Sequence, residues 1–415
     1  MTTAETESVE SFRARARTWL AENMPRLDPD LPPPALGDDD EEWVRARELQ
    51  KILYAGGFAG ICFPQEYGGL GLTLAHQKAF TQETAGYEMP VQLNIPTFSI
   101  VAATILDMGT EEQKRERISA AIRGDEVFCQ FLSEPSGGSD LAGLLTRAEL
   151  DGDTWILNGQ KTWSTSAYAA DWGLCLARTN WDVPKHRGLT MFLVPTTAPG
   201  LHMNRVKMVN GSREFCEEFF TDVQLPASAV VGEVNDGWAV ASRQLFHERN
   251  AVGGGSPYVS GLAGRPRALG GQSPFTIARA TGRAAEPGVR ERVGEWLAVE
   301  TVQNQMVARV SRAIGTGALP APAASLLRLF HAEAMQRGTD LAMDVAGAQV
   351  AAGVGTEEGV TGRAGVAYLS RQGASLGGGS SEMARNQISE RLLGMPREPA
   401  ADRDVPFNQV KRGRS

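Results

Sequence analysis

The sequence predicts an α+β protein of three parts: an N-terminal α-helical domain, a middle antiparallel β-barrel or sandwich, and a C-terminal α-helical bundle. Helical periodicity of apolar residues runs through 8–122, and short strands separated by turn clusters fill 128–231. Helical periodicity returns after Gly232 and persists to Gly394. At 415 residues, the chain is also longer than one hydrophobic core usually grows. We place the domains at 1–126, 127–233 and 234–415.

The composition is typical of a globular protein and excludes several classes of partner. Apolar residues make up 42% and charged residues 22% of the chain. A net charge of −8 without a basic stripe argues against nucleic acid or an anionic membrane as partner. No signal peptide and no run of about eighteen apolar residues is found, which predicts a cytoplasmic protein. The cysteines lack metal-ligand spacing, so we predict buried thiols and no metal site at Cys62, Cys129, Cys175 and Cys216.

Two amphipathic helices are expected at the start of the chain, over residues 8–22 and from Glu41 to Gly56. Their apolar residues recur three or four positions apart, at Val9, Phe12, Ala16 and Trp19 and then at Trp43, Ala46, Leu49 and Leu53. The Pro-rich and acidic segment Pro25–Asp40 is predicted to be a mobile surface excursion, because proline prevents regular structure there. Further helices are expected at 74–88, 96–108 and 111–122.

The middle region alternates β-prone runs with turn residues. The expected strands are Thr154–Asn158, Trp172–Thr179, Gly188–Val194 and Phe215–Val223. Asp151-Gly152-Asp153 and Asn158-Gly159 are predicted to be tight turns between strands, because these residues tolerate the positive φ that a hairpin needs. Successive antiparallel strands of this length predict a small barrel or sandwich.

A small-residue loop in this region has the chemistry of a ligand site. Ser136–Ser139 offers unhindered backbone N–H groups and two hydroxyls, which suit a phosphate or a flat heterocycle. Trp163 and Thr165 lie two residues apart in a predicted strand, so the indole and the hydroxyl are expected on one face. A flavin needs such a ring and donor. The alternative is that the glycines only reverse the chain and that Trp163 belongs to the core.

The C-terminal helices are expected to be broken at Gly253–Ser256, 264–274 and Gly315–Pro322. The first of them begins near Gly237 and has an apolar stripe at Trp238, Ala241, Leu245 and Val252. Glu248 falls in a gap of that stripe, where burial would raise the carboxyl pKa towards that of a general base. The alternative is that Glu248 and Arg249 form a charge pair at the edge of a helix interface.

The combined motifs of the middle region resemble those of the acyl-CoA dehydrogenase family. That family carries E-P-x-x-G-S-D followed by N-G-x-K-x-W-x-T. The matching residues here are Glu134-Pro135, Gly138-Ser139-Asp140, Asn158-Gly159, Lys161, Trp163 and Thr165. Ser164 stands where the family usually carries a β-branched apolar residue. The α, β, α order also matches that family over nearly the whole chain.

The resemblance implies FAD-dependent α,β-dehydrogenation of an acyl-CoA thioester, with the β-hydride passed to flavin N5. Some family members carry the catalytic Glu in a Glu-Arg pair on the first C-terminal helix, and others carry it near the C-terminus. His247-Glu248-Arg249 is similar to the first pattern, while Gly378 occupies the second position without an acid. The implied electron acceptor is an electron-transferring flavoprotein. The implied assembly is a homo-oligomer, dimeric or tetrameric, or a heteromer with a homologous subunit.

The resemblance also assigns roles to individual residues. It implies that Gln130, Leu132 and Ser133 line the isoalloxazine, that Trp163 covers one ring face, and that Thr165 reaches the N5 region. Ser139 is assigned to a flavin or CoA phosphate, and Ser380 and Glu382 to the adenosine half. Arg249 and Gly378 are assigned to the substrate, with the Gly378 N–H on the thioester carbonyl.

One family motif has no clean match in this chain. The R-x-x-F-G motif, which holds FAD from a neighbouring subunit, is missing around 264–286, where Arg279 and Arg283 are possible substitutes. Two alternatives therefore stay open beside the dehydrogenase. One is a flavin monooxygenase of the same superfamily. The other is a weakly catalytic partner subunit of a heteromeric acyl-CoA dehydrogenase.

Overall fold

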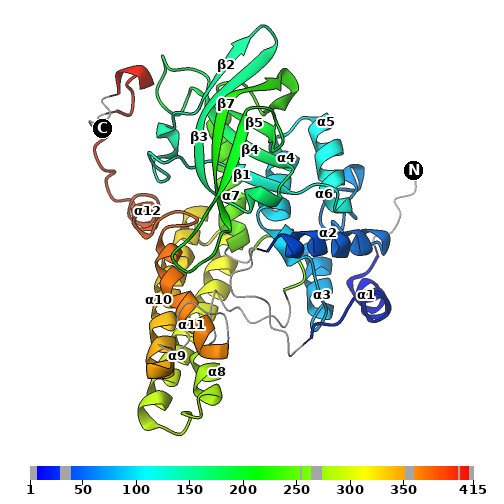
Figure 1. The fold of residues 1–415 in the computed structure, drawn as a ribbon, viewed down its shortest axis with the longest axis vertical. Coiled ribbons are helices and arrows are strands. Elements are labelled where there is room, and N and C mark those ends of the chain that lie inside the picture. Colours follow the sequence, from blue (N-terminus) through cyan, green and yellow to red (C-terminus); the bar gives the residue numbers. More distant parts are fainter. Residues whose placement is uncertain are drawn as a thin grey trace.

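The computed structural model describes residues 7–28, 39–252, 255–262, 273–350, 359–400 and 402–410. Figure 1 shows N-terminal helices packed on one side of a β-sheet and a C-terminal helical bundle that extends away from the end of the sheet. This arrangement confirms the predicted fold class. The domain boundaries stay a prediction.

The first two helices form where periodicity predicts them. α1 (Val9–Asn23) is capped by the Ser8 hydroxyl, and α2 (Asp40–Ala55) by the Asp39 carboxylate. All four predicted apolar residues of α2 are buried. Residues 29–38 of the predicted surface excursion lie outside the described residues. The remaining N-terminal α-helices are α3 (Leu74–Glu83), α4 (Ala103–Met108), α5 (Glu111–Gln113) and α6 (Ser119–Arg123).

One stretch of the described residues, Val91–Met108, is long and apolar enough to cross a membrane, with a mean hydropathy of 1.3. This finding is weak evidence for a membrane span, because 67% of the stretch is buried inside the fold, as in the core helix of a globular domain. Its last turns form α4, which packs against α7 (Gly237–Val252).

The middle region is an eight-stranded sheet. Seven of its strands follow the order β6-β7-β3-β2-β4-β5-β8, and the eighth, β1, pairs with β4. The strands are β1 (Phe128–Phe131), β2 (Arg147–Asp151), β3 (Thr154–Thr165), β4 (Trp172–Arg178), β5 (Leu189–Pro195), β6 (Leu201–Val206), β7 (Phe215–Pro226) and β8 (Val230–Val231). The pairing differs in one respect from the expected successive antiparallel strands, because β1 and β2 run parallel to β4.

Of the two predicted turns, one forms and one does not. Asp151 pairs with Thr154 across a two-residue loop in which Gly152 has φ +63°, so this hairpin is confirmed. The prediction of a tight turn at Asn158-Gly159 is wrong. Both residues lie inside β3, where the register against β7 shifts between Leu157 and Gly159. A glycine within a strand often marks such a bulge.

In the described part of the chain, buried residues form two separate cores. The larger core runs through the N-terminal helices and the sheet, and it includes Val240 and Ala241 of α7. The smaller core lies in the C-terminal bundle around Ile277 and Val345. α7 therefore packs with the first two regions. The other C-terminal α-helices are α8 (Pro274–Ala280), α9 (Pro287–Gly315), α10 (Ala324–Ala346), α11 (Gly359–Ser370) and α12 (Ser381–Gln387).

A buried ion pair fixes the loop that follows β1. The Lys161 ammonium lies 3.0 Å from the Glu134 carboxylate and also donates to the Leu132 carbonyl at 3.0 Å. Glu134 accepts the backbone N–H groups of Leu145 and Thr146 at 2.6 and 2.8 Å. Burial raises the pKa of Glu134, but Lys161 and these hydrogen bonds outweigh that effect and hold it below its usual value. The pair therefore joins the loop to β2 and β3.

Replacing Lys161 with Met is expected to lower the free energy of unfolding by roughly 3–5 kcal/mol, because Glu134 would keep a buried charge without its cation. Urea denaturation measures the loss. Arg123→Met is the matched control, since it removes the cation of an exposed pair with Asp125 (2.7 Å). The control should lose less than about 1 kcal/mol. Equal losses in the two variants would contradict the importance of the buried pair.

Candidate functional site

Glu248 lies near the C-terminal end of α7, half-buried at the edge of its packed face. The predicted apolar stripe is only partly right. Ala241 is buried, whereas Val252 is 49% exposed. Gln244 and His247 complete the buried face instead. α7 contacts both α4 and β5, so its buried surface is wider than one stripe.

Side-chain hydrogen bonds hold α7 against its neighbours. His247 Nε2 lies 2.7 Å from the Asp107 carboxylate of α4. On the β1 side, Gln244 donates from Nε2 to Gln130 Oε1 at 2.7 Å. Gln130 in turn donates to Glu248 Oε2 at 3.5 Å. The carboxylate of Glu248 is thus connected through two amides to the sheet and to its own helix.

The loop before α12 reaches Glu248 from the C-terminal bundle. Gly378 has φ +70°, and a Cβ added to it would lie 3.6 Å from Glu248 Oε1. Arg328 of α10 donates from Nε to the Gly378 carbonyl at 3.4 Å and from Nη2 to the Gly377 carbonyl. The structure therefore brings together Glu248 and Gly378, which the sequence separates widely, and adds Arg328 beside them.

The electrostatics of this cluster favour a carboxylate that can accept a proton. Burial raises the pKa of Glu248, while the Gln130 hydrogen bond and the charges of Arg249 and Arg328 act in the opposite direction. Burial also lowers the pKa of Arg249 and of Arg328, against the attraction of Glu248. A carboxylate whose pKa is raised by burial, with two cations nearby, can take up a proton, as a general base does.

The predicted flavin residues of β3 lie beside the residues that lead into the loop Ser136–Asp140, which we call the motif loop. The Thr162 N–H donates to the Ser133 carbonyl at 2.9 Å. A second bulge follows, at which Trp163 has φ +65° and its side chain is 53% exposed. The indole packs edge-on against Phe215, with ring centroids 5.7 Å apart. Thr165 is half-buried. An exposed indole next to a partly exposed hydroxyl fits the ring system of a flavin.

The motif loop itself is open to solvent. Residues 135–140 are all exposed, and a Cβ added to Gly137 would meet nothing within 4 Å. Ser139 is thus accessible, as a phosphate contact requires. Its neighbour Asp140 is held by Lys185, whose ammonium lies 3.0 and 3.1 Å from the two carboxylate oxygens. The donor set of this loop fits a phosphate-bearing cofactor.

The predicted adenosine-side residues lie at the start of α12. Ser380 is the N-cap and accepts the Met383 N–H at 3.2 Å, as its capping role predicts. Glu382 is exposed in the first turn. Arg283 donates to the Val345 carbonyl at 2.6 Å, so it is tied inside the bundle. Residues 263–272 of the stretch with the missing Arg-Phe motif lie outside the described residues.

Ser164, the departure from the family motif, has a buried partner. Its hydroxyl donates to Glu218 Oε2 at 2.8 Å, while Oε1 of Glu218 is buried without a hydrogen bond within the described chain. Burial raises the pKa of Glu218 to about 8, so this carboxyl is mostly protonated at neutral pH. A hydroxyl at Ser164 therefore satisfies a buried acid that an apolar residue would leave unpaired.

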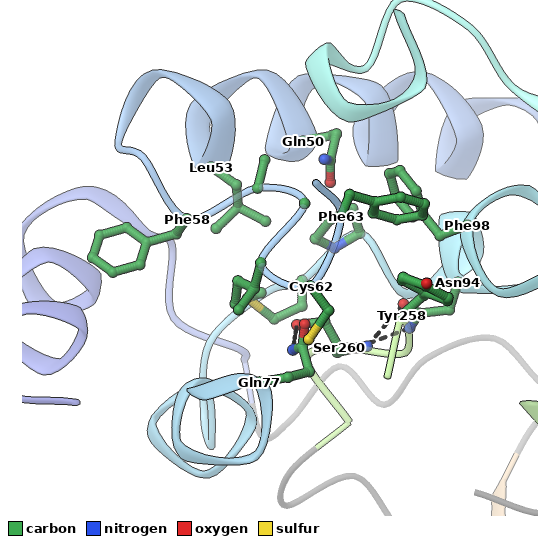
Figure 2. Close-up of a pocket in the computed structure, with 15 residues that line it drawn as sticks. Gln50, Leu53, Phe58, Cys62, Phe63, Gln77, Asn94, Phe98, Tyr258 and Ser260 are labelled. Atoms are coloured by element: carbon green, nitrogen blue, oxygen red, sulfur yellow. Dashed lines mark hydrogen bonds between the residues drawn. The ribbon is translucent and has the colours of Figure 1, made fainter. Parts of the chain in front are cut away.

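A cavity between the N-terminal helices and residues 255–262 is separate from this cluster (Figure 2). Tyr258 stacks on Phe63 there, and Ser260 accepts a hydrogen bond from Gln77 at 2.9 Å. The cavity has a volume of about 40 Å³ and is lined by none of the predicted site residues. It has room for ordered water and not for an acyl chain.

Sequence reasoning missed two side chains of the site, Arg328 and Gln244. Arg328 interrupts an apolar run of α10, and a charge in such a run is a signal that could have been followed. Gln244 lies on the packed face of α7 at the position next to the predicted stripe. The sequence shows no partner for its amide.

Comparison with protein families covers nearly the whole chain. The acyl-CoA dehydrogenase N-terminal, middle and C-terminal domain families match residues 6–125, 129–223 and 235–393. The chain is 34% identical over 396 residues to acyl-CoA dehydrogenase IpdE1 of Mycobacterium tuberculosis, which covers 94% of this chain and 99% of that protein.

Solved structures of related proteins have the same fold. The structure described as "Tcur3481-Tcur3483 steroid ACAD" is 28% identical with a TM-score of 0.73, over 95% of this chain and all of that one. The ChsE4-ChsE5 complex from Mycobacterium tuberculosis is 28% identical with a TM-score of 0.69, over 96% of this chain and all of that one. The chain therefore belongs to the acyl-CoA dehydrogenase family and is an FAD-dependent oxidoreductase that dehydrogenates acyl-CoA thioesters.

Proposed function

We propose that Glu248 is the base that removes the α-proton of the acyl-CoA thioester. The observation that carries this proposal is the position of a partly buried carboxylate whose Oε1 lies 3.6 Å from where a Cβ on Gly378 would be. FAD, when bound, supplies the acceptor for the β-hydride. Glu248 takes the α-proton on a carboxylate oxygen, and the β-hydrogen would leave as hydride to that acceptor. The electron pair of the broken Cα–H bond then forms the Cα–Cβ double bond.

The Gly378 loop has the complementary role of orienting the thioester. The N–H of Gly378 would donate to the thioester carbonyl and stabilise the negative charge that develops as the α-proton leaves, a contribution of a few kcal/mol. Arg328 supports this role, because it bonds the carbonyls of Gly377 and Gly378 and so fixes the direction of the peptide units. Arg249 carries a charge beside Glu248 on the same helix and is proposed to contact the substrate.

The assembly and the substrate class follow from related proteins and from the surface. We propose a heteromer with a homologous subunit, since two related structures are described by a pair of chain names. Apolar side chains are exposed on the C-terminal region at Phe275, Leu297, Leu376, Met383 and Leu393. Such a surface favours burial against another subunit. One related structure is described as a steroid enzyme, so we propose a polycyclic acyl group.

The placement of Glu248 favours dehydrogenation over the two alternatives. A flavin monooxygenase has no use for a carboxylate beside Gly378, and a partner subunit that lacks catalysis has no need of a base. We further propose that an electron-transferring flavoprotein reoxidises the enzyme and that the enzyme works in the cytoplasm.

Replacing Glu248 with Gln is expected to slow flavin reduction by a factor of about a hundred or more, because the amide keeps the shape and cannot accept the α-proton. Anaerobic bleaching of the flavin absorption by an acyl-CoA measures the rate, with bound FAD quantified first. Glu233→Gln, at an exposed acid ahead of α7, is the control and should reduce normally. Near-normal reduction in Glu248→Gln would refute the assignment and direct the search to Glu214 or Glu382.

Replacing Gln130 with Leu is expected to move the acidic limb of the rate profile to higher pH. The Gln130 amide lowers the pKa of Glu248, so its loss lets burial raise that pKa further. The base must be ionised to act, so activity then rises only at higher pH. The pH dependence of flavin reduction measures the shift. Gln224→Leu, at an exposed position of β7, should leave the limb unchanged.

Substrate preference and assembly can be tested together. A CoA thioester of a steroid side chain is expected to bleach the flavin at least about tenfold more efficiently than butyryl-CoA or palmitoyl-CoA. A polycyclic group buries more apolar area than a butyryl group, and its rigid rings lose less conformational freedom on binding than a palmitoyl chain does. Mass in solution, with and without the co-expressed homologous chain, measures assembly. Full FAD occupancy in a monomer would contradict the heteromer, and equal rates on straight chains would contradict the polycyclic substrate.

A further inference from the structure

The C-terminal tail, residues 402–410, returns from the helical bundle to the β-sheet. Figure 1 shows the chain leaving α12 and running up beside the sheet. There it follows the loop between β4 and β5. The Phe407 N–H donates to the Val183 carbonyl, and the Asn408 N–H donates to the Trp181 carbonyl, both at 2.9 Å. A β-bridge between Pro184 and Pro406 adds to this contact.

Phe407 is the anchor of the tail. Its side chain is buried, and its ring lies 3.5 Å from the Arg178 guanidinium carbon, as in a cation–π contact. The Trp181 ring packs against it with centroids 5.6 Å apart. Arg178, at the end of β4, is among the largest fully buried side chains of the protein. Phe407 therefore separates a buried cation from water.

Arg178 organises the segment that continues the motif loop. Its Nη2 donates to the Ala142 carbonyl at 2.6 Å, and its Nε donates to the Leu144 carbonyl at 3.3 Å. Its Nη1 donates to the Lys185 carbonyl at 3.2 Å. A single guanidinium thus joins residues 141–144 to the loop that the tail follows. Because the Arg178 side chain is fully buried, its donors need protein acceptors, and these carbonyls supply them.

A second contact connects the tail with the motif loop more directly. The Lys185 ammonium lies 2.8 Å from Asp402 of the tail and 3.0 Å from Asp140 of the motif loop. The two carboxylates raise the pKa of Lys185, although burial opposes them. The ammonium group is therefore charged and bridges two segments far apart in the sequence.

We propose that the C-terminal tail is a latch that holds the motif loop Ser136–Asp140 in the conformation that binds a phosphate of FAD or CoA. The inference rests on the proposed function. Phe407 acts through Arg178, and Asp402 acts through Lys185. Both are positioning residues, because neither belongs to the loop that would touch the ligand.

The loop needs such a support because it is exposed. Near Glu134 it is fixed by the ion pair with Lys161 and by a turn in which the Gly137 N–H bonds the Glu134 carbonyl at 2.9 Å. At its other end the Asp140 carboxylate is held by Lys185. Loss of the tail would remove the second carboxylate of Lys185 and expose Arg178. The loop would then sample many conformations, and binding would cost more entropy.

The test uses the full chain with its partner subunit where one is needed. Phe407→Ala and Asp402→Asn are compared with Phe407→Tyr, which keeps the ring, and with Asp404→Asn, at an exposed residue of the tail. Hydrogen exchange of residues 136–146 is measured first, without ligand. Phe407→Ala and Asp402→Asn are expected to exchange faster, while Phe407→Tyr and Asp404→Asn match the unchanged protein.

Ligand binding is measured next, with FAD, with an acyl-CoA and with the same acyl group on CoA lacking its 3′-phosphate. We expect about tenfold weaker binding of FAD or of acyl-CoA in Phe407→Ala, with KM raised, kcat kept and binding restored in Phe407→Tyr. Weaker FAD binding alone assigns the loop to the flavin phosphates. If Phe407→Ala binds acyl-CoA more weakly but binds the analogue without the 3′-phosphate normally, the motif loop is assigned to the 3′-phosphate of CoA.

Two outcomes overturn the latch. One is unchanged exchange of residues 136–146 in both Phe407→Ala and Asp402→Asn. The other is faster exchange with normal affinity for FAD and acyl-CoA. Failure of the unchanged protein to bind FAD would instead refute the proposed function, and the exchange measurement would still decide whether the tail holds the loop. If Phe407→Ala does not fold, Asp402→Asn carries the same test.

Discussion

The buried carboxylate of Glu134 is the constraint on which the arrangement of the site depends. It lies three residues after β1, which carries Gln130 towards Glu248, and it is bonded to Lys161 of β3, two residues before the exposed Trp163. It also bonds the backbone just before β2. One ion therefore sets the spacing of three strands. Buried charges that are fully paired fix geometry well, because every alternative arrangement leaves a charge without a partner.

Much of the fold follows from patterns within single elements. The stripe of α2 and the Asp151-Gly152 hairpin depend on neighbouring residues only, and both form as predicted. Asn158-Gly159 has the same local signal as a turn, yet it lies in the long strand β3 because pairing with β7 overrides it. The direction of β1 and β2 relative to β4 could not be predicted, since alternation of side chains is the same in parallel and antiparallel strands.

The sequence predicted the site residues that belong to a family motif. It did not predict the residues of other segments that hold them in place. Glu248 and Gly378 could be matched to a family pattern, and the structure places them together. The charge of Arg328 in an apolar run was a visible signal, but its partners Gly377 and Gly378 were not, and the Phe407–Arg178 contact could not be found, because each joins segments that are distant in the sequence. A side chain whose partner is distant leaves no periodic trace, and its importance is visible only once the chain is folded.

The two cores have a consequence for how the enzyme becomes active during synthesis. The fully buried residues of the larger core, those of α7 included, precede residue 253, whereas the smaller core and the Gly378 loop come later in the chain. Domains generally fold in the order in which they leave the ribosome. Glu248 is then already set on its helix while the Gly378 loop is still missing. The nascent protein holds this carboxylate in place first, and only docking of the last helices brings Gly378 beside it.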